Sequence, residues 1–200
     1  MVLDIIFGFL TAFEAPIAVL IFAIIIMVLL NIPYKFLVNQ EEVGDTKKRI
    51  KELNKKSRAA QKQGDTAQVK SIMSESMKLN STMMKSTMKP MIIGFVIVIL
   101  LLPWLHDTYG DLLVPEDGLV EINGEMIDVS QYSVPTKGVV ISDGLWNFVS
   151  EGDSVKMQRV VVMLPIEVPI VGDDMGWLAW YFVISIPAMV IIRKMMGINL

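Results

Sequence analysis

The sequence has no cysteine and a single histidine, His106, and these two scarcities exclude several classes of protein. Without cysteine the chain has no disulfide, no thiolate metal site and no cysteine nucleophile. One histidine leaves little room for zinc or Ser-His-Asp chemistry. The phosphate-binding loop GxxxxGK(S/T) is also missing, so nothing points to nucleotide hydrolysis. We therefore expect a protein that is not an enzyme and has no catalytic residue, cofactor or metal.

Charged residues are absent from three long stretches, residues 15–30, 90–105 and 176–192. The whole chain is 53% hydrophobic and 20% charged, with a mean hydropathy of +0.53, which is more apolar than a typical soluble domain. A helix needs about 20 apolar residues to cross a hydrocarbon core of ~30 Å, so the second and third stretches are slightly short. Two explanations stay open: ordinary spans whose flanking side chains reach the interface, or short helices that thin the bilayer.

The net charge of −3 hides two segments of opposite charge. Residues 35–89 contain 13 Lys/Arg and 6 Asp/Glu, a net charge of +7. Residues 107–174 contain 3 Lys/Arg and 13 Asp/Glu, a net charge of −10. Because basic segments stay in the cytoplasm, the first segment and the C-terminus are expected inside. The N-terminus and the acidic segment are then outside. The sequence therefore predicts a multi-pass protein of the plasma membrane with its N-terminus out and its C-terminus in.

These features predict an α-helical membrane protein with three transmembrane helices, a cytoplasmic antiparallel helical hairpin and a small β-rich extracytoplasmic insert. The expected parts are the N-terminal segment with the first transmembrane helix (1–35), the basic, methionine-rich hairpin (36–89), the second transmembrane helix (90–106), the acidic β-rich domain (107–174), and the third transmembrane helix with its cytoplasmic tail (175–200). Residues 5–13 form either a half-helix at the outer interface or an extension of the first span. Pro90 is expected in the first turn of the second span, where a helix tolerates proline.

The hairpin is predicted as two helices, residues 41–63 and 66–88, with the break at Gly64. Glycine adopts the left-handed conformation that ends a helix, and Asp65 is a good N-cap for the next one. Apolar residues recur at three- and four-residue spacings, which favours a coiled-coil-like pair with a weak seam.

The acidic segment contains a strong β-hairpin signal around Asn123-Gly124. Further strands are expected at 139–142 and 156–164, with turns at Asp143 and Asp153.

Basic residues crowd the first hairpin helix. A solvated surface on the cytoplasmic side explains such a cluster, but contact with anionic headgroups or with ribosomal RNA phosphates fits as well. The residues concerned are Lys47, Lys48, Arg49, Lys51, Lys55, Lys56, Arg58 and Lys62.

Methionine is concentrated in the second hairpin helix and at the start of the next span. Its flexible, polarizable side chain suits surfaces that accept varied apolar partners. These side chains either pack in the hairpin seam or form a capture site for hydrophobic segments in transit. The residues are Met73, Met77, Met83, Met84, Met88 and Met91.

Five polar residues lie within or beside the apolar stretches, most of them near the cytoplasmic ends. Polar groups inside a membrane bundle are functional candidates, whereas separate ones at the ends of spans act as interfacial anchors. If they converge, they form a substrate groove open to the cytoplasm and the lipid. The residues are Asn31, Lys35, Lys89, Ser185 and Arg193.

The layout resembles the archaeal branch of the YidC/Oxa/Alb insertase superfamily, whose eukaryotic relatives include the catalytic subunit of the ER membrane complex and the Get insertase. Residues 1–106 and 173–200 carry the resemblance, through their topology and the hairpin between Lys35 and Lys89. It implies a three-helix core with a hydrophilic groove that inserts hydrophobic segments without nucleotide hydrolysis. Bacterial members have an arginine within the groove. This chain has no charge inside its apolar stretches, so Lys35 and Lys89 are the nearest substitutes.

Two functions from different classes fit these features. The first is an insertase and chaperone. Its expected partners are nascent membrane proteins, the lipid bilayer, and the ribosome or translocon, and DNA is not among them. A hetero-oligomer is also compatible with the sequence. The alternative is a non-catalytic membrane scaffold or receptor that binds a partner protein.

Overall fold

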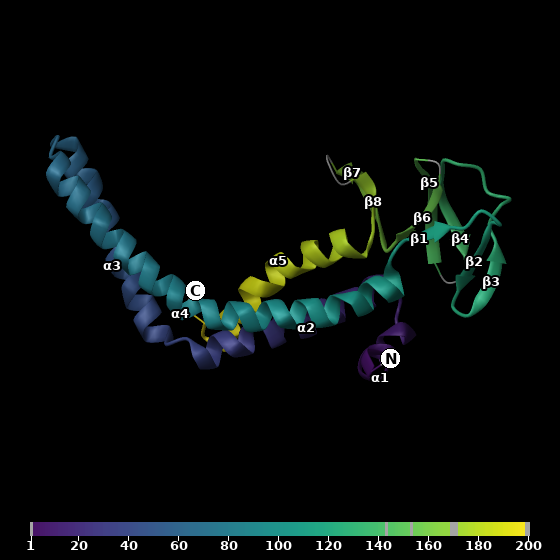
Figure 1. Ribbon diagram of the computed structural model, residues 1–200, viewed down its shortest axis with the longest axis horizontal. Helices are drawn as coiled ribbons and strands as arrows, with labels where there is room; N and C mark the ends of the chain where they lie inside the picture. The colour runs from purple at the N-terminus through teal and green to yellow at the C-terminus, as the bar shows by residue number, and fades with distance from the viewer. Residues whose placement is uncertain (1, 143, 153, 169–171, 199–200) are drawn as a thin grey trace. The chain divides into compact units, whose positions relative to one another are not determined.

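The computed structural model describes residues 2–142, 144–152, 154–168 and 172–198 (Figure 1). The chain forms two compact units. The first comprises residues 1–25 and 99–187, and the second residues 26–98 and 188–200. Among the described residues, three helices are long and apolar enough to cross a membrane: Ala15–Leu37, Thr66–Tyr109 and Trp177–Met196.

The N-terminal residues fold separately from the first span. Helix α1 (Val2–Phe7) continues into the 3-10 helix η1 (Gly8–Ala12), and α2 (Ala15–Leu37) begins two residues after η1 ends. Phe13 has extended backbone angles, with φ −103° and ψ 156°, and its N–H donates to the carbonyl of Leu10. Residues 5–13 therefore do not extend the first span.

The helical hairpin forms where the sequence predicted it. Helix α3 (Gln40–Lys62) is N-capped by Asn39, whose side chain accepts from the N–H groups of the next turn. Gly64 has φ +71°, and the Asp65 carboxylate caps the following helix by accepting from the N–H of Gln68 at 2.9 Å. The two helices lie side by side (Figure 1) and are bridged by an ion pair, 2.7 Å long, between Arg49 and Glu75.

Helix α4 (Thr66–Tyr109) is a single helix of 44 residues, so the second hairpin helix and the second span are not separate elements. The prediction that Pro90 lies in a first turn is wrong, because this proline lies deep inside α4 with its side chain fully buried. Its missing N–H leaves the carbonyl of Ser86 without its helical partner. One turn further along, α4 lies close to α2: a Cβ on Gly94 would lie 3.3 Å from the side chain of Leu30.

In the residues that the structure describes, the acidic segment forms eight strands within the first unit. A four-stranded antiparallel sheet has the order β1-β6-β5-β4, and two hairpins, β2–β3 and β7–β8, accompany it. The strands are β1 (Leu112–Val114), β2 (Leu119–Ile122), β3 (Glu125–Asp128), β4 (Thr136–Ile141), β5 (Gly144–Glu151), β6 (Ser154–Val160), β7 (Val162–Val168) and β8 (Gly172–Met175). Helix α5 (Trp177–Met196) follows β8 after one residue.

The strand predictions are confirmed in part. Asn123 and Gly124 both have positive φ and join β2 to β3 in a tight turn, as the sequence indicated. The single strand predicted over 156–164 is wrong: β6 ends at Val160, because the N–H of Val161 donates to the carbonyl of Met175 and redirects the chain toward β8. Asp143 and Asp153, placed in turns by the sequence, lie outside the described residues.

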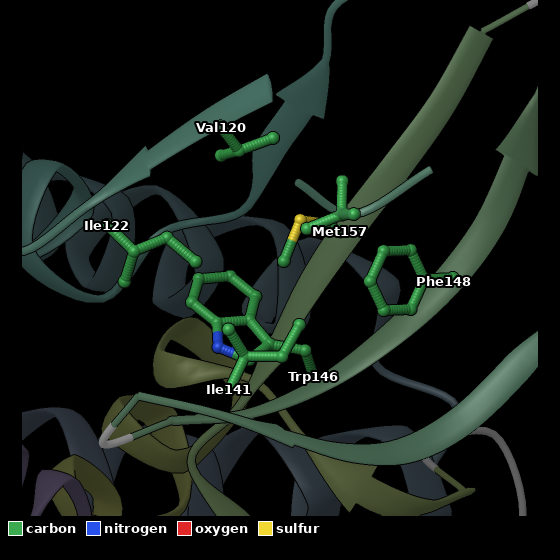
Figure 2. Packing of buried hydrophobic residues seen from close by; sticks show 7 residues of the cluster. Val120, Ile122, Ile141, Trp146, Phe148 and Met157 are labelled. Atoms are coloured by element: carbon green, nitrogen blue, oxygen red, sulfur yellow. The ribbon is translucent and has the colours of Figure 1, made fainter. Parts of the chain in front are cut away.

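The core of this sheet is built around Trp146 and Phe148 from β5 and Met157 from β6, each at most 1% exposed (Figure 2). Val120 and Ile122 of β2 pack onto the cluster, so the β2–β3 hairpin covers one face of the sheet. Burial of these side chains makes the segment a small folded body rather than a loop between two spans.

Candidate functional site

A buried amide and an arginine meet between α2 and α5 in the second unit. Asn31 is 1% exposed, and its Oδ1 accepts a hydrogen bond from Arg193 Nε at 3.2 Å. Its Nδ2 donates to the carbonyl of Met27 at 2.7 Å. The Arg193 guanidinium also lies 5.8 Å from the ring centroid of Tyr34. Donor and acceptor of the amide are therefore both used, and the arginine has two partners.

The sequence places this contact at the ends of two apolar stretches. Asn31 is the first polar residue after the apolar stretch of α2, and Arg193 lies in the last turn of α5, where a cation faces the negative end of the helix dipole. A helical side chain points back toward the N-terminus of its helix, so a long arginine reaches the apolar part of the bundle. A polar group in such surroundings is expensive unless it is paired, as both are.

The other residues predicted for a groove do not share this contact. Lys35 and Lys89 have exposed side chains, and Ser185 is 9% exposed but belongs to the first unit. Lys35 and Lys89 therefore do not take part in the contact of Asn31 with Arg193. Sequence reasoning missed Tyr34, although its spacing of three residues from Asn31 places both on one helix face.

The methionines of α4 form an exposed surface on one side of the helix. Met73, Met77, Met84, Met88 and Met91 are between 47% and 70% exposed. They follow each other at intervals of four, seven, four and three residues, which keeps them on one helix face. Met83 is half-buried and faces elsewhere. We call the five exposed residues the methionine face. Four of them, all but Met73, line a hollow of about 580 Å³ together with Asn80, Ser81, Lys85 and Thr87.

The basic residues of α3 also remain in solvent. All eight have exposed side chains, and two of them form short ion pairs, Lys48 with Asp45 at 3.0 Å and Arg49 with Glu75 at 2.7 Å. The Asp45 carboxylate raises the pKa of Lys48 by accepting its hydrogen bond. Five others follow one another every three or four residues and so form a stripe along one face of α3. We call Lys47, Lys51, Lys55, Arg58 and Lys62 the basic stripe.

Comparison with protein families decides the relationship. The family model described as integral membrane protein EMC3/TMCO1-like matches residues 4–200. The chain belongs to this family. The EMC3/TMCO1-like family is part of the YidC/Oxa/Alb insertase superfamily and is related to membrane insertases. Comparisons with curated proteins and with solved structures gave no significant match.

Membership in the EMC3/TMCO1-like family agrees with the three apolar helices, and the chain is a multi-pass membrane protein. The match runs through the acidic segment as well as the helices. No group of three or more His, Cys, Asp or Glu side chains within the described ranges is arranged to hold a metal ion.

The contact between Asn31 and Arg193 predicts a measurable energetic coupling between α2 and α5. In a double-mutant cycle of Asn31→Leu and Arg193→Met, the unfolding free energy in detergent should show a coupling of about 1 kcal/mol, the size found for polar contacts between membrane helices. The same cycle with Lys35→Met in place of Asn31→Leu should show none. Equal coupling in both cycles contradicts the contact.

Proposed function

We propose that this EMC3/TMCO1-like protein is a membrane protein insertase and chaperone that works without nucleotide hydrolysis. One observation carries the proposal: the methionine face lies on a helix that continues unbroken into an apolar span. Phe95, four residues after Met91, is 66% exposed and extends the same face. A hydrophobic segment bound at the hairpin thus finds one continuous apolar surface leading into lipid.

The contact of Asn31 with Arg193 supplies the polar part of this path. A substrate carries a hydrophilic flank across the bilayer together with its apolar segment, and that flank needs hydrogen-bond partners while water is scarce. Arg193 offers further N–H donors beyond the one that Asn31 uses. Burial of the apolar segment, at about 0.8 kcal/mol per CH₂, then drives its release into lipid without ATP.

The orientation follows from the charge asymmetry and is part of the proposal. The basic hairpin and the C-terminus are cytoplasmic, and the N-terminus and the acidic β-rich segment are extracytoplasmic. With this orientation, a protein of the archaeal branch resides in the plasma membrane, and the methionine face meets nascent chains on the side where they are made.

The basic stripe favours the ribosome over lipid headgroups as its partner. The part of α4 from Thr66 to Pro90 is about 36 Å long, so an unbroken α4 carries the hairpin tip far from the membrane surface. Arg58 and Lys62 lie near that tip. With α4 along the bilayer normal, they are farther from the headgroups than the Debye length of about 8 Å. Phosphates of ribosomal RNA are the polyanion that reaches this position.

Reconstitution tests the insertase. Vesicles containing the protein should insert a substrate with one transmembrane helix and a short tail, whereas empty vesicles should not. The triple variant Met77→Ser, Met84→Ser and Met88→Ser should lower insertion about tenfold or more, because apolar contact area is lost at three points of the capture surface.

Its control makes the same chemical change at exposed methionines of the β strands, Met126→Ser and Met163→Ser, and should insert normally. Insertion that is equal with and without the protein refutes the proposal. If the triple variant inserts the substrate as well as the control does, the methionine face takes no part in the mechanism.

Ribosome contact predicts a charge-dependent interaction. The variant Lys51→Glu, Lys55→Glu and Arg58→Glu should abolish salt-sensitive cosedimentation with ribosomes, because repulsion of phosphates replaces attraction. The matched variant Lys70→Glu, Lys78→Glu and Lys85→Glu changes the charge equally on α4 and should still bind. If the α3 variant loses only its binding to anionic vesicles, the headgroup alternative is correct.

A further inference from the structure

The β-rich segment lies between the ends of two helices. It follows Tyr109, the last residue of α4, and precedes Trp177, the first residue of α5. Two sets of polar contacts, both within the first unit, join its four-stranded sheet to the end of α4 and to β8, the strand that precedes α5.

The first set holds the end of α4. Arg159 on β6 is 9% exposed and donates from Nη1 to the carbonyl of Thr108 at 2.9 Å. Its guanidinium lies 5.1 Å from the ring centroid of Tyr109 and 5.5 Å from that of Trp146. The last carbonyls of a helix lack partners of their own, and a cation is favoured there. One side chain thus binds the terminal turn of α4 to the core of the sheet.

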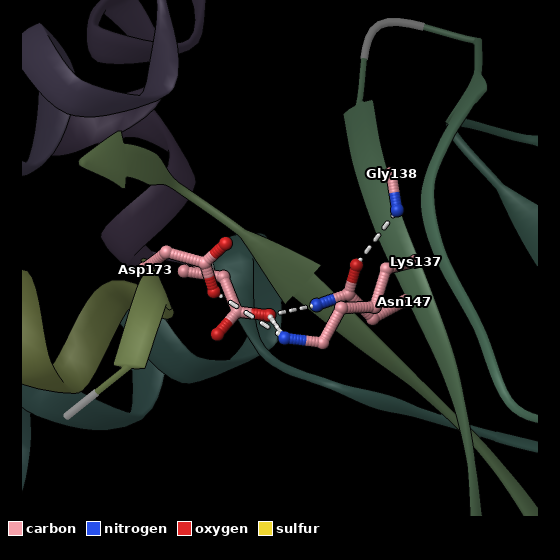
Figure 3. A network of polar contacts seen from close by, with 5 residues as sticks. Lys137, Gly138, Asn147 and Asp173 are labelled. Atoms are coloured by element: carbon pink, nitrogen blue, oxygen red, sulfur yellow. Dashed lines mark hydrogen bonds and ion pairs between the residues drawn. The ribbon is translucent and has the colours of Figure 1, made fainter. Parts of the chain in front are cut away.

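The second set holds the strand that leads into α5 (Figure 3). Lys137 on β4 lies 3.3 Å from carboxylate oxygens of both Asp173 and Asp174 on β8. Asn147 on β5 is 3% exposed, donates to Asp174 and accepts from the N–H of Gly138 at 2.9 Å. The carboxylates of Asp174 and Asp173 raise the pKa of Lys137 by accepting its hydrogen bonds.

The two sets are joined through adjacent strands. In the pairing of β5 with β6, Trp146 lies opposite Arg159 and Asn147 lies opposite Gln158. Arg159 and Asn147 therefore occupy neighbouring pairs of one hydrogen-bonded ladder, on a sheet that carries a cluster of buried hydrophobic residues. A link of this kind is short and stiff, because packed interiors deform little.

We infer that the β-rich segment is a bracket that fixes the distance between the end of α4 and the start of α5, with Arg159 and Asp174 as its positioning residues. The bracket gives a role to a segment that takes no part in capture or in the contact of Asn31 with Arg193. Its bearing on activity rests on the proposed function: an insertase that admits substrates between helices has to hold those helices together at one end.

The absence of native cysteine makes the test direct, since spin labels attach only at introduced sites. Asp107→Cys and Leu178→Cys place labels on exposed positions at the two helix ends, and pulsed electron resonance on the full-length protein in nanodiscs measures their separation. Without further changes the distance distribution should be narrow. Arg159→Met with Asp174→Ala should broaden it and shift its mean.

Two further variants separate positioning from misfolding. Val140→Ala shortens an exposed apolar side chain on β4 and should leave the distribution narrow. Arg159→Lys keeps the charge but not the forked guanidinium and should give an intermediate width. A narrow distribution in the double variant overturns the bracket, and so does equal broadening by Val140→Ala.

Insertion activity gives the second readout. The double variant should insert at least about twofold less than the unmodified protein, a modest effect for a network that couples two sites, with substrate crosslinking to the methionine face unchanged. Loss of that crosslinking together with insertion would indicate general unfolding and count against the bracket. If the unmodified protein itself fails to insert, the proposed function is wrong, while the distance distributions still decide the bracket.

Discussion

The continuity of α4 is the constraint on which the other features depend. A helix in lipid satisfies its backbone hydrogen bonds internally, so a single helix can pass from water into the bilayer with its backbone paired, except at the carbonyl of Ser86 opposite Pro90. Thr66 and Tyr109 are its two ends, and between them the exposed methionines and Phe95 stay in one register. The hairpin is thus joined to a span by helical backbone and not by a loop.

Local signals in the sequence sufficed where structure is decided locally. Gly64 and Asp65 marked the hairpin turn, and Asn123-Gly124 marked a β turn, because each requires a particular backbone conformation. The buried position of Pro90 inside α4 was missed, because proline is usually tolerated only in the first turn of a helix. Strand β5 was missed too, since the buried Asn147 interrupts its apolar pattern and is satisfied only by residues far along the chain.

At the polar site, too, the sequence indicated the candidate residues, whereas helix packing decides which of them meet. Counting charges within apolar stretches indicated none, yet Arg193 reaches Asn31 from the last turn of α5. A stretch of uncharged residues defines where a backbone crosses lipid, but a long side chain carries its charge several ångströms along the helix. Which of several candidate residues meet is a property of helix packing. The sequence alone therefore offered five candidates, and the structure brings together two of them.

Photo-crosslinking along α4 tests the central claim most directly. A crosslinker placed in turn at every position from 73 to 95 is offered ribosome-bound nascent chains of increasing length. Nascent chains of unrelated sequence should crosslink with a helical period, strongly at Met77, Met84, Met88 and Phe95, and the strongest position should move from Met73 toward Phe95 as the chain lengthens. Crosslinks of equal strength around the helix, or capture of one folded partner only, would contradict this account and favour a scaffold or receptor.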